Sequence, residues 1–299
     1  MPIGPRPLCD ADAALRRGEL MASLDPRLNA FRPDLAAKQL EGKVEAARFV
    51  EGAPRQVIDP HAALRREPHP EARLDTEALY GERFTVFDTT EEGWAWGQLH
   101  TDGYVGWMPT SALSAVGDTP THFVLARTTF GFPAPDIKMP PRLSLPFGAT
   151  VTVTKADGRF ARTNAGLFLP SQHLALIPAP ASDFVAVAER FIEAPYLWGG
   201  KTSDGIDCSG LVQISLQAAG ISCPRDSDMQ ESALGQPVAL GNLTRGDLVF
   251  WKGHVAIARN GTTLLHANAH HMMVASEPIG EAVARIKAGG SEVTSIKRI

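Results

Sequence analysis

The segment "RFTVFDTTEEGWAWGQLHTDGYVGWMPTSAL", residues 83–113, most narrowly limits what this chain can fold into. Apolar and polar residues alternate along it, and that is the period of a half-buried β-strand rather than of a helix. Asp102-Gly103 gives a tight-turn signal between two such runs, because glycine reaches the positive φ that hairpin turns need. The segment therefore predicts a small antiparallel β-barrel and excludes a helical bundle for this region.

A second, looser copy of the pattern follows in "LPFGATVTVTKADGRFARTNAGLFLPSQHLAL", residues 145–176. Both copies run from a glycine through a strand, a charged turn and a second strand to a proline and a leucine. Duplication of a unit of about 60 residues indicates two related small β-barrels, expected at residues 56–116 and 117–178. At least two of the first copy's tryptophans Trp94, Trp96 and Trp107 are expected in its barrel core.

Composition and charge limit the partners and the setting. The chain has 299 residues, 44% hydrophobic and 21% charged, which is ordinary for a soluble protein of several domains. A net charge of −4 with scattered Lys and Arg argues against nucleic acid or an anionic membrane as the main partner. The three cysteines lack a disulfide pattern, and neither a signal peptide nor an apolar run of about 18 residues is present. We expect a cytoplasmic protein without a membrane span.

The two ends of the chain differ from the predicted barrels in their sequence patterns. Residues 1–55 are expected to form a short N-terminal helical arm, because apolar residues from Asp25 to Val50 recur at roughly helical spacing: Leu35, Leu40, Val44 and Ala47. The linker "PAPASD" marks a boundary before residues 183–299.

The last 117 residues, 183–299, predict an α+β domain. "FVAVAERFIEAPYLWGG" is typical of an amphipathic helix ended by Pro195, and "CSGLVQISLQAAGI" of a second helix that stops at Gly220. Three short strands follow in "DLVFWKG", "HVAIARNG" and "TLLHANA", the last two joined by an Asn260-Gly261 turn. A helix that carries a cysteine thus packs on an antiparallel sheet that carries histidines.

Cys208 is the candidate nucleophile. A thiol attacks well only as a thiolate, and the unpaired N–H groups at a helix start favour that anion. Cys208 falls at the predicted start of the second helix, behind a glycine-rich loop. Cys223 follows the helix and precedes a proline, and Cys9 lies near the chain start, so neither has this setting.

A nucleophile also needs a base and a group that orients it. His254 opens one predicted strand, and His266 lies 12 positions later on the next, directly opposite if the hairpin pairs in simple register about Asn260-Gly261. A slip of one residue pair would bring Asn268 there instead. The polar residues His270 and His271 are also local but lie beyond the run. No C-x-x-C or H-E-x-x-H pattern accompanies these residues, so we expect neither a metal site nor a cofactor.

Six separated motifs of this region together resemble the NlpC/P60 family of papain-like cysteine peptidases. They are "PYLWGG", "GIDCSGLVQ", "PRDSDMQ", "RGDLVFW", "GHVAIA" and "LLHA". The pattern "GWAWGQL…DGYVGWMPTSAL" is similar to bacterial SH3 domains attached to cell-wall enzymes. The architecture resembles the dipeptidyl-peptidase VI branch, which includes γ-D-glutamyl-L-diamino acid endopeptidases. The resemblance implies a papain-like NlpC/P60 catalytic domain at 183–299, preceded by two SH3-like barrels and the arm.

Roles follow from the resemblance, position by position. It implies Cys208 as nucleophile, His254 as base, His266 as the orienting group and Tyr196 beside the oxyanion. The substrate contacts that it implies are Asp207, Ser209, Ser227 and Tyr104.

The resemblance also assigns the substrate's amino end. Asp207 would hold the free α-amine of an N-terminal L-Ala, while also capping the helix. The branch places an acidic residue of the first barrel at this pocket. This chain has Arg73 there, with acids nearby at Glu71, Glu77 and Glu82.

The implied reaction is hydrolysis of the amide between the D-Glu γ-carboxyl and diaminopimelate in small murein peptides, as part of cell-wall peptide recycling. The sequence leaves two alternatives open. One is a papain-like amidase or acyltransferase that acts on a different amide, and the other is a non-catalytic binder of cell-wall peptides.

Overall fold

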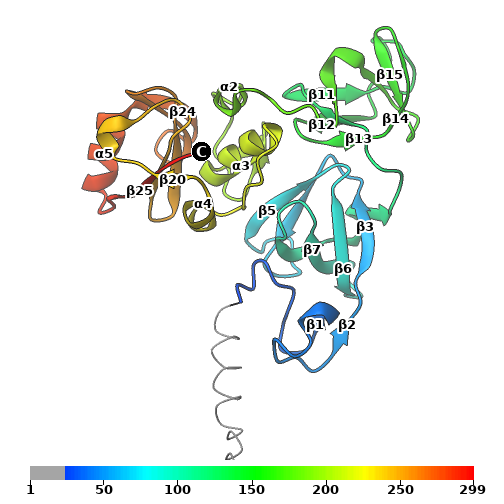
Figure 1. Cartoon of the computed structure of the whole chain (residues 1–299). Helices are drawn as coiled ribbons and strands as arrows, with labels where there is room; N and C mark the ends of the chain where they lie inside the picture. Colours follow the sequence, from blue (N-terminus) through cyan, green and yellow to red (C-terminus); the bar gives the residue numbers. More distant parts are fainter. Residues whose placement is uncertain (1–23) are drawn as a thin grey trace, which may run out of the picture.

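The computed structural model describes residues 24–299, in which two β-rich lobes precede an α+β lobe (Figure 1). Cys9 and the rest of residues 1–23 lie outside the described residues. The described part holds no helix long and apolar enough to cross a bilayer.

The helical arm expected from Asp25 to Val50 is wrong. This segment instead contains two short strands and one 3-10 turn: β1 (Ala36–Ala37), η1 (Lys38–Leu40) and β2 (Phe49–Val50). β1 and β2 pair in parallel. Gly42 has a φ of +78°, a left-handed conformation that ends any right-handed helix. The apolar residues behind the prediction are buried, but they pack on the first barrel.

Two of the three tryptophans are buried, yet outside the barrel interior. Trp96 and Trp107 are 4% and 8% exposed, and they cluster with the apolar residues of the N-terminal segment. The Arg32 guanidinium lies 4.4 and 5.0 Å from their ring centroids, which is cation–π distance. Residues 24–50 therefore cover one outer face of the barrel. The barrel interior is a separate cluster around Leu64 and Phe84.

The first lobe is the β-barrel that the alternating segment predicted. Its seven-stranded antiparallel sheet has the order β5-β4-β8-β7-β6-β3-β9. Asp102-Gly103 lies between β7 and β8, and Gly103 takes the positive φ (77°) expected of the turn. The strands are β3 (Ala53–Val57), β4 (His61–Arg65), β5 (Leu74–Leu79), β6 (Arg83–Thr89), β7 (Trp94–Leu99), β8 (Val105–Pro109) and β9 (Leu113–Ala115).

The second lobe ends in the same order of elements as the first, a strand followed by a 3-10 turn and another strand. In the first, β8 runs into a 3-10 turn at Thr110–Ala112 and then β9; in the second, β16 runs into Ser171–His173 and then β17. Its strands form three small sheets, with orders β13-β10-β17, β11-β12 and β14-β15-β16. The strands are β10 (His122–Val124), β11 (Thr128–Gly131), β12 (Leu143–Pro146), β13 (Thr150–Val151), β14 (Val153–Asp157), β15 (Phe160–Thr163), β16 (Phe168–Pro170) and β17 (Leu174–Leu176).

The C-terminal lobe is a six-stranded sheet with helices on both faces (Figure 1). The sheet order is β20-β25-β21-β22-β23-β24. Helix α3 lies on the side toward the barrels, and α5 lies on the outer side. The strands are β18 (Lys201–Thr202), β19 (Gly205–Ile206), β20 (Gln236–Pro237), β21 (Leu248–Trp251), β22 (His254–Ala258), β23 (Thr263–Asn268), β24 (Met273–Pro278) and β25 (Val293–Arg298), and the helices are α2 (Phe184–Glu189), α3 (Cys208–Ala218), α4 (Ser227–Ala233) and α5 (Ile279–Ala288).

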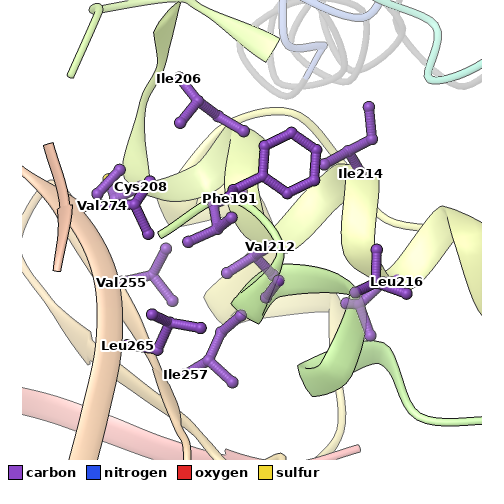
Figure 2. Packing of buried hydrophobic residues seen from close by; sticks show 14 of the residues in the cluster. Phe191, Ile206, Cys208, Val212, Ile214, Leu216, Val255, Ile257, Leu265 and Val274 are labelled. Atoms are coloured by element: carbon purple, nitrogen blue, oxygen red, sulfur yellow. The ribbon is translucent and has the colours of Figure 1, made fainter. Parts of the chain in front are cut away.

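The main core of this lobe lies between α3 and the sheet. Figure 2 shows Val212 and Ile214 of α3 in the same cluster as Val255 and Leu265 of the sheet. Apolar side chains recur on α3 at helical spacing and on β22 at alternate positions, so each element buries one face against the other. The first helix predicted here, α2, ends at Glu189, earlier than the expected stop at Pro195.

Both β lobes contribute side chains to this core. Phe147 of the second lobe is 2% exposed and makes an edge-to-face contact with Phe191, with ring centroids 5.8 Å apart. From the first lobe, Leu79 joins the same cluster, and Glu82 pairs with the fully buried Lys201 at 3.5 Å. The three lobes therefore share packed apolar surface.

This shared core predicts the effect of truncating Phe147. Phe147→Ala removes a buried ring at the lobe interface and should lower the free energy of unfolding of the C-terminal lobe by about 3–5 kcal/mol. Urea denaturation followed by tryptophan fluorescence measures the change. Phe130→Ala is the matched control, because Phe130 is 49% exposed, and it should cost under about 1 kcal/mol. Equal losses in the two variants would contradict the shared core.

Candidate active site

Cys208 is the first residue of α3, as the sequence predicted. Asp207 is the N-cap, and its Oδ1 accepts a hydrogen bond from the backbone N–H of Gly210 at 2.7 Å. The preceding loop passes so close to the helix start that a Cβ on Gly210 would lie 2.4 Å from the carbonyl oxygen of Gly200. Glycine is needed there because no larger residue fits the close approach.

Burial, rather than the helix N-terminus, has the largest effect on the thiol. Cys208 is 7% exposed and belongs to the apolar core (Figure 2). Burial raises the pKa of the Cys208 thiol, and backbone hydrogen bonds from Val255 and Ser209 only partly oppose that shift. The backbone N–H group of Ser209 at the helix start lowers this pKa, as expected, but burial outweighs it. A thiolate at Cys208 needs a cation formed beside it, and a protonated base supplies one.

The two histidines predicted as base and orienting partner lie side by side on β22 and β23. His254 begins β22, next to Val255, whose backbone contacts the Cys208 thiol. His254 Nε2 and His266 Nδ1 are 2.8 Å apart, and His266 is 1% exposed. Burial lowers the pKa of His254, so its neutral form is favoured before the thiol gives up its proton.

The hairpin register differs from the simple one by one residue pair. β22 and β23 pair Ile257 with Leu265 and Ala258 with Leu264. The register that places His254 directly opposite His266 would have paired Ile257 with Thr263 instead. The two histidines therefore meet diagonally and not directly across. Asn268, the alternative that a register slip favoured, uses its side-chain oxygen for the backbone N–H of His271 at 2.8 Å.

The histidine pair continues into two residues that the sequence reasoning missed. His266 Nε2 lies 2.6 Å from Glu277 Oε1, and Arg285 of α5 donates to the same carboxylate oxygen. The pKa of Glu277 is lowered to about 2, chiefly by the hydrogen bond from His266. The sequence signal was weak: Glu277 is one acid among many, and only strand pairing places it beside His266.

A cavity of about 220 Å³ opens at Cys208. It brings together six of the eight residues predicted for the site, namely Cys208, Tyr196, Asp207, Ser209, Ser227 and Tyr104. Burial raises the pKa of Tyr196 to about 12, so it stays a neutral hydroxyl. No cluster of His, Cys, Asp and Glu within residues 24–299 could hold a metal ion.

The carboxylate oxygens of Asp207 already accept hydrogen bonds from other residues of the protein. Arg225, 1% exposed, donates to both of its carboxylate oxygens at 2.8 and 2.9 Å. Oδ2 also accepts from the backbone N–H of Gly199 at 2.8 Å. The Ser209 hydroxyl accepts from Arg225 at 2.9 Å. Asp207 and Ser209 thus shape the loop before Cys208, and their oxygens are already used.

Two other acids that line the cavity, Asp226 and Asp75, have partners other than Arg225. The Tyr104 hydroxyl donates to Asp226 Oδ2 at 3.1 Å. Asp75 of the first barrel also lines the cavity, two residues beyond Arg73 and paired with Arg66 at 3.1 Å. The Arg73 side chain is half exposed, and its guanidinium lies 4.6 Å from the Trp198 ring centroid. Asp75 is therefore the acid that the first barrel contributes to the cavity lining.

The other acids near Arg73 have different partners. Glu77 contacts His61 at 2.7 Å, and Glu82 accepts from the backbone N–H of Leu79 at 2.6 Å. Neither these two residues nor Glu71 lines the cavity at Cys208. The second cysteine of the described residues, Cys223, is buried away from it, and burial raises the pKa of its thiol to about 12.

Arg27 reaches the cavity from the N-terminal segment. Its guanidinium donates to Asp226 at 2.8 Å and to Asp228 at 2.7 and 3.0 Å. These ion pairs join the segment to the C-terminal lobe in the wall of the cavity. Tyr104 approaches the same carboxylate of Asp226 from the barrel. All three parts of the cavity wall thus converge on one acid.

A buried helix-start thiol with a neighbouring histidine pair on an antiparallel sheet defines a papain-like cysteine hydrolase. Residues 193–285 match the model of the NlpC/P60 family, and residues 64–113 match that of the bacterial dipeptidyl-peptidase Sh3 domain. The chain is 30% identical over 228 residues to a gamma-D-glutamyl-L-lysine dipeptidyl-peptidase of Bacillus cereus, covering 65% of this chain and 67% of that one. The chain belongs to the NlpC/P60 family and is a cysteine peptidase.

Two further comparisons agree with this membership. Dipeptidyl-peptidase 6 of Lysinibacillus sphaericus is 26% identical over 234 residues, covering 71% of this chain and 86% of that one. A crystal structure of an NlpC/P60 family protein from Bacillus cereus aligns with a TM-score of 0.70 over 82% of this chain and 99% of that one, at 23% identity. The structural likeness shows that the fold is shared over 82% of this chain.

The buried ion pair predicts a large stability loss on truncation of Arg225. Arg225→Ala leaves the Asp207 carboxylate buried without its cation and should cost about 3–5 kcal/mol of unfolding free energy. Urea denaturation measures it. Arg245→Ala is the control: Arg245 pairs with Asp183 and Glu189 but is 39% exposed, so its loss should stay within about 1 kcal/mol. A cost for Arg225→Ala as small as the control's would contradict the assignment.

The lowered pKa of Glu277 predicts a specific acid sensitivity. An acid with a depressed folded-state pKa stabilises the fold above its unfolded-state pKa, which is near 4.5 for Glu277, and loses that effect as the pH falls through about 2. The difference in Tm between the wild-type protein and Glu277→Gln should therefore be largest above pH 4.5 and shrink toward pH 2. Calorimetry at pH 6 and pH 2.5 measures it. An equal difference at both pH values would show that the Glu277 carboxylate is not the source of the stabilisation.

Proposed function

We propose that the protein hydrolyses the amide between the D-Glu γ-carboxyl and a diamino acid, diaminopimelate, in murein peptides with a free N-terminal L-Ala. The observation that carries this proposal is the cavity at Cys208, which the first barrel lines with Tyr104 and Asp75 and the C-terminal lobe with Asp226 and Asp228. Although Arg27, Arg66 and Arg73 also line the cavity, its carboxylates favour a short peptide that enters by its ammonium group. Two relatives are named gamma-D-glutamyl-L-lysine dipeptidyl-peptidase, and that name supports a bond between a γ-D-glutamyl group and a diamino acid.

Asp226 is the best partner for the substrate amine. Its carboxylate lines the cavity, holds the Tyr104 hydroxyl and already contacts one cation, the Arg27 guanidinium. Asp75 adds a second negative charge from the barrel. Asp207, which the family resemblance implied for this role, has both oxygens bound by Arg225. A charge-assisted bond from the ammonium to Asp226 would measure the substrate from its amino end.

The reaction begins with transfer of the Cys208 proton to His254. The thiolate then attacks the γ-carbonyl carbon, and backbone N–H groups at the start of α3 stabilise the oxyanion, with Tyr196 beside them. His254 protonates the leaving amine of the diamino acid. It next takes a proton from water, which hydrolyses the thioester and releases L-Ala-D-Glu.

The requirement for a free amine leads to the biological role that we propose. A free L-Ala amine exists only on peptides already released from the glycan, so these peptides are degradation products to be recycled. We place the step in the cytoplasm, because cysteines without a disulfide pattern favour a reducing compartment.

Paired peptides test this function directly. Wild-type protein should cleave L-Ala-γ-D-Glu-diaminopimelate at the γ-amide and lose at least about 100-fold in kcat/KM on the N-acetylated peptide, because acetylation removes the charge that Asp226 recognises. Mass spectrometry of the products locates the cut. Cys208→Ala should remove all cleavage.

Asp226→Asn should reduce the ratio of kcat/KM for the free-amine peptide to kcat/KM for the acetylated one. Asp136 is an exposed acid of the second lobe, and Asp136→Asn should leave that ratio unchanged. Equal cleavage of both peptides would rule out amine recognition. Cleavage of neither would indicate a different amide, and turnover by Cys208→Ala would remove the nucleophile assignment.

A further inference from the structure

The hydrogen bonds beyond the histidine pair carry information about proton positions. Glu277 accepts from His266 and Arg285 through the same oxygen, Oε1. Arg285 has only N–H donors, and a carboxylate held in this way stays ionised and can only accept. The hydrogen between Glu277 and His266 must therefore reside on His266 Nε2.

This placement determines the tautomers of both imidazoles. A neutral His266 with a proton on Nε2 has an unprotonated Nδ1, which accepts a hydrogen bond. Its neighbour at 2.8 Å, His254 Nε2, must then be the donor. His254 is left with a lone pair on Nδ1, and this is the atom that can take the proton of Cys208. The opposite tautomer of His266 would put the His254 proton on Nδ1 and block the base.

We propose that Glu277 is a positioning residue that, through His266, holds His254 in the tautomer that can deprotonate Cys208. The only proton that moves is the one from Cys208 Sγ to His254 Nδ1, while the proton on His254 Nε2 stays on its bond to His266. The negative charge of Glu277 also lies in line with the imidazolium that forms.

Several charged groups act on this proton transfer from different elements. Arg285 from α5 and any charge on His266 from β23 disfavour a proton on His254, whereas Glu277 from β24 favours it. On the α3 side, Asp207 disfavours the Cys208 thiolate and Arg225 favours it. Loss of Glu277 leaves Arg285 unbalanced behind the histidines, so the thiolate–imidazolium pair becomes less stable.

A simpler role for Glu277 would be structural, because its ion pair with Arg285 also ties α5 to the sheet. Two variants separate the roles. Glu277→Gln and Arg285→Met both break that ion pair, but only the first removes the carboxylate from His266. If Glu277 only docks α5, the two variants should lose the same activity.

The test uses the full chain and two readouts. The rate at which iodoacetamide alkylates Cys208, read by mass spectrometry of its peptide from pH 4 to 9, reports the thiolate. It rests on acyl-transfer chemistry at Cys208 but not on the murein peptide, so it stands if that substrate is wrong. The second readout is kcat and KM on the peptide that the wild-type protein cleaves.

We expect Glu277→Gln to lower the alkylation rate at pH 7 at least about 10-fold, to shift its pH profile upward and to lower kcat about 100-fold with little change in KM. Arg285→Met should stay within about threefold of the wild type in both the alkylation rate at pH 7 and kcat. A gap between the variants of less than about threefold in the alkylation rate, or of less than about tenfold in kcat, would overturn the proposal.

A measurement on the wild-type protein covers the case in which Glu277→Gln does not fold. The ¹⁵N chemical shifts of the two imidazoles report which ring nitrogen carries hydrogen. We expect hydrogen on Nε2 of both His254 and His266 at pH 7. Hydrogen on Nδ1 of His266 would overturn the proposal independently of any variant.

Discussion

The buried ion pair between Asp207 and Arg225 is the interaction on which the rest of the site depends. The Asp207 carboxylate caps α3 and holds the preceding loop through the N–H of Gly199. Arg225 neutralises it and reaches into the first barrel, where it donates to Thr76 at 2.8 Å. A charge of each sign is thus buried only because every oxygen and most N–H groups find a partner. The pair sets the nucleophile's position and joins the catalytic lobe to its neighbour.

The active site is composite, and this explains the order of lobes along the chain. The C-terminal lobe supplies the thiol and the histidines, while the first barrel supplies Tyr104 and Asp75. Residues 24–50 pack on the barrel and add Arg27. A catalytic lobe alone would leave the groove at Cys208 open at one end. The barrel closes it, so the lobe contacts decide how much of a substrate can lie beyond the scissile bond.

Much of the site could be predicted from local sequence, and the failures have physical causes. The positions of Cys208, His254 and His266 could be predicted because a helix start and two strand positions can be recognised from periodicity and turns. The helix prediction for the N-terminal segment failed because its apolar residues follow a helical spacing but pack against indole rings distant in sequence. Asp207 was expected to read the substrate, but Arg225, eighteen residues away, takes its oxygens. Glu277 was missed because only the pairing register of β23 and β24 places it beside His266.

The sequence by itself determined the two β-barrel patterns, the helix that begins at Cys208 and the strands that carry the histidines, since each depends on interactions within a few residues. Only the tertiary structure decided which acid faces the cavity, which partner each histidine has and how strongly burial shifts the thiol. Those properties depend on distances between residues far apart in the chain and on exclusion of water, and both arise only when the lobes pack together.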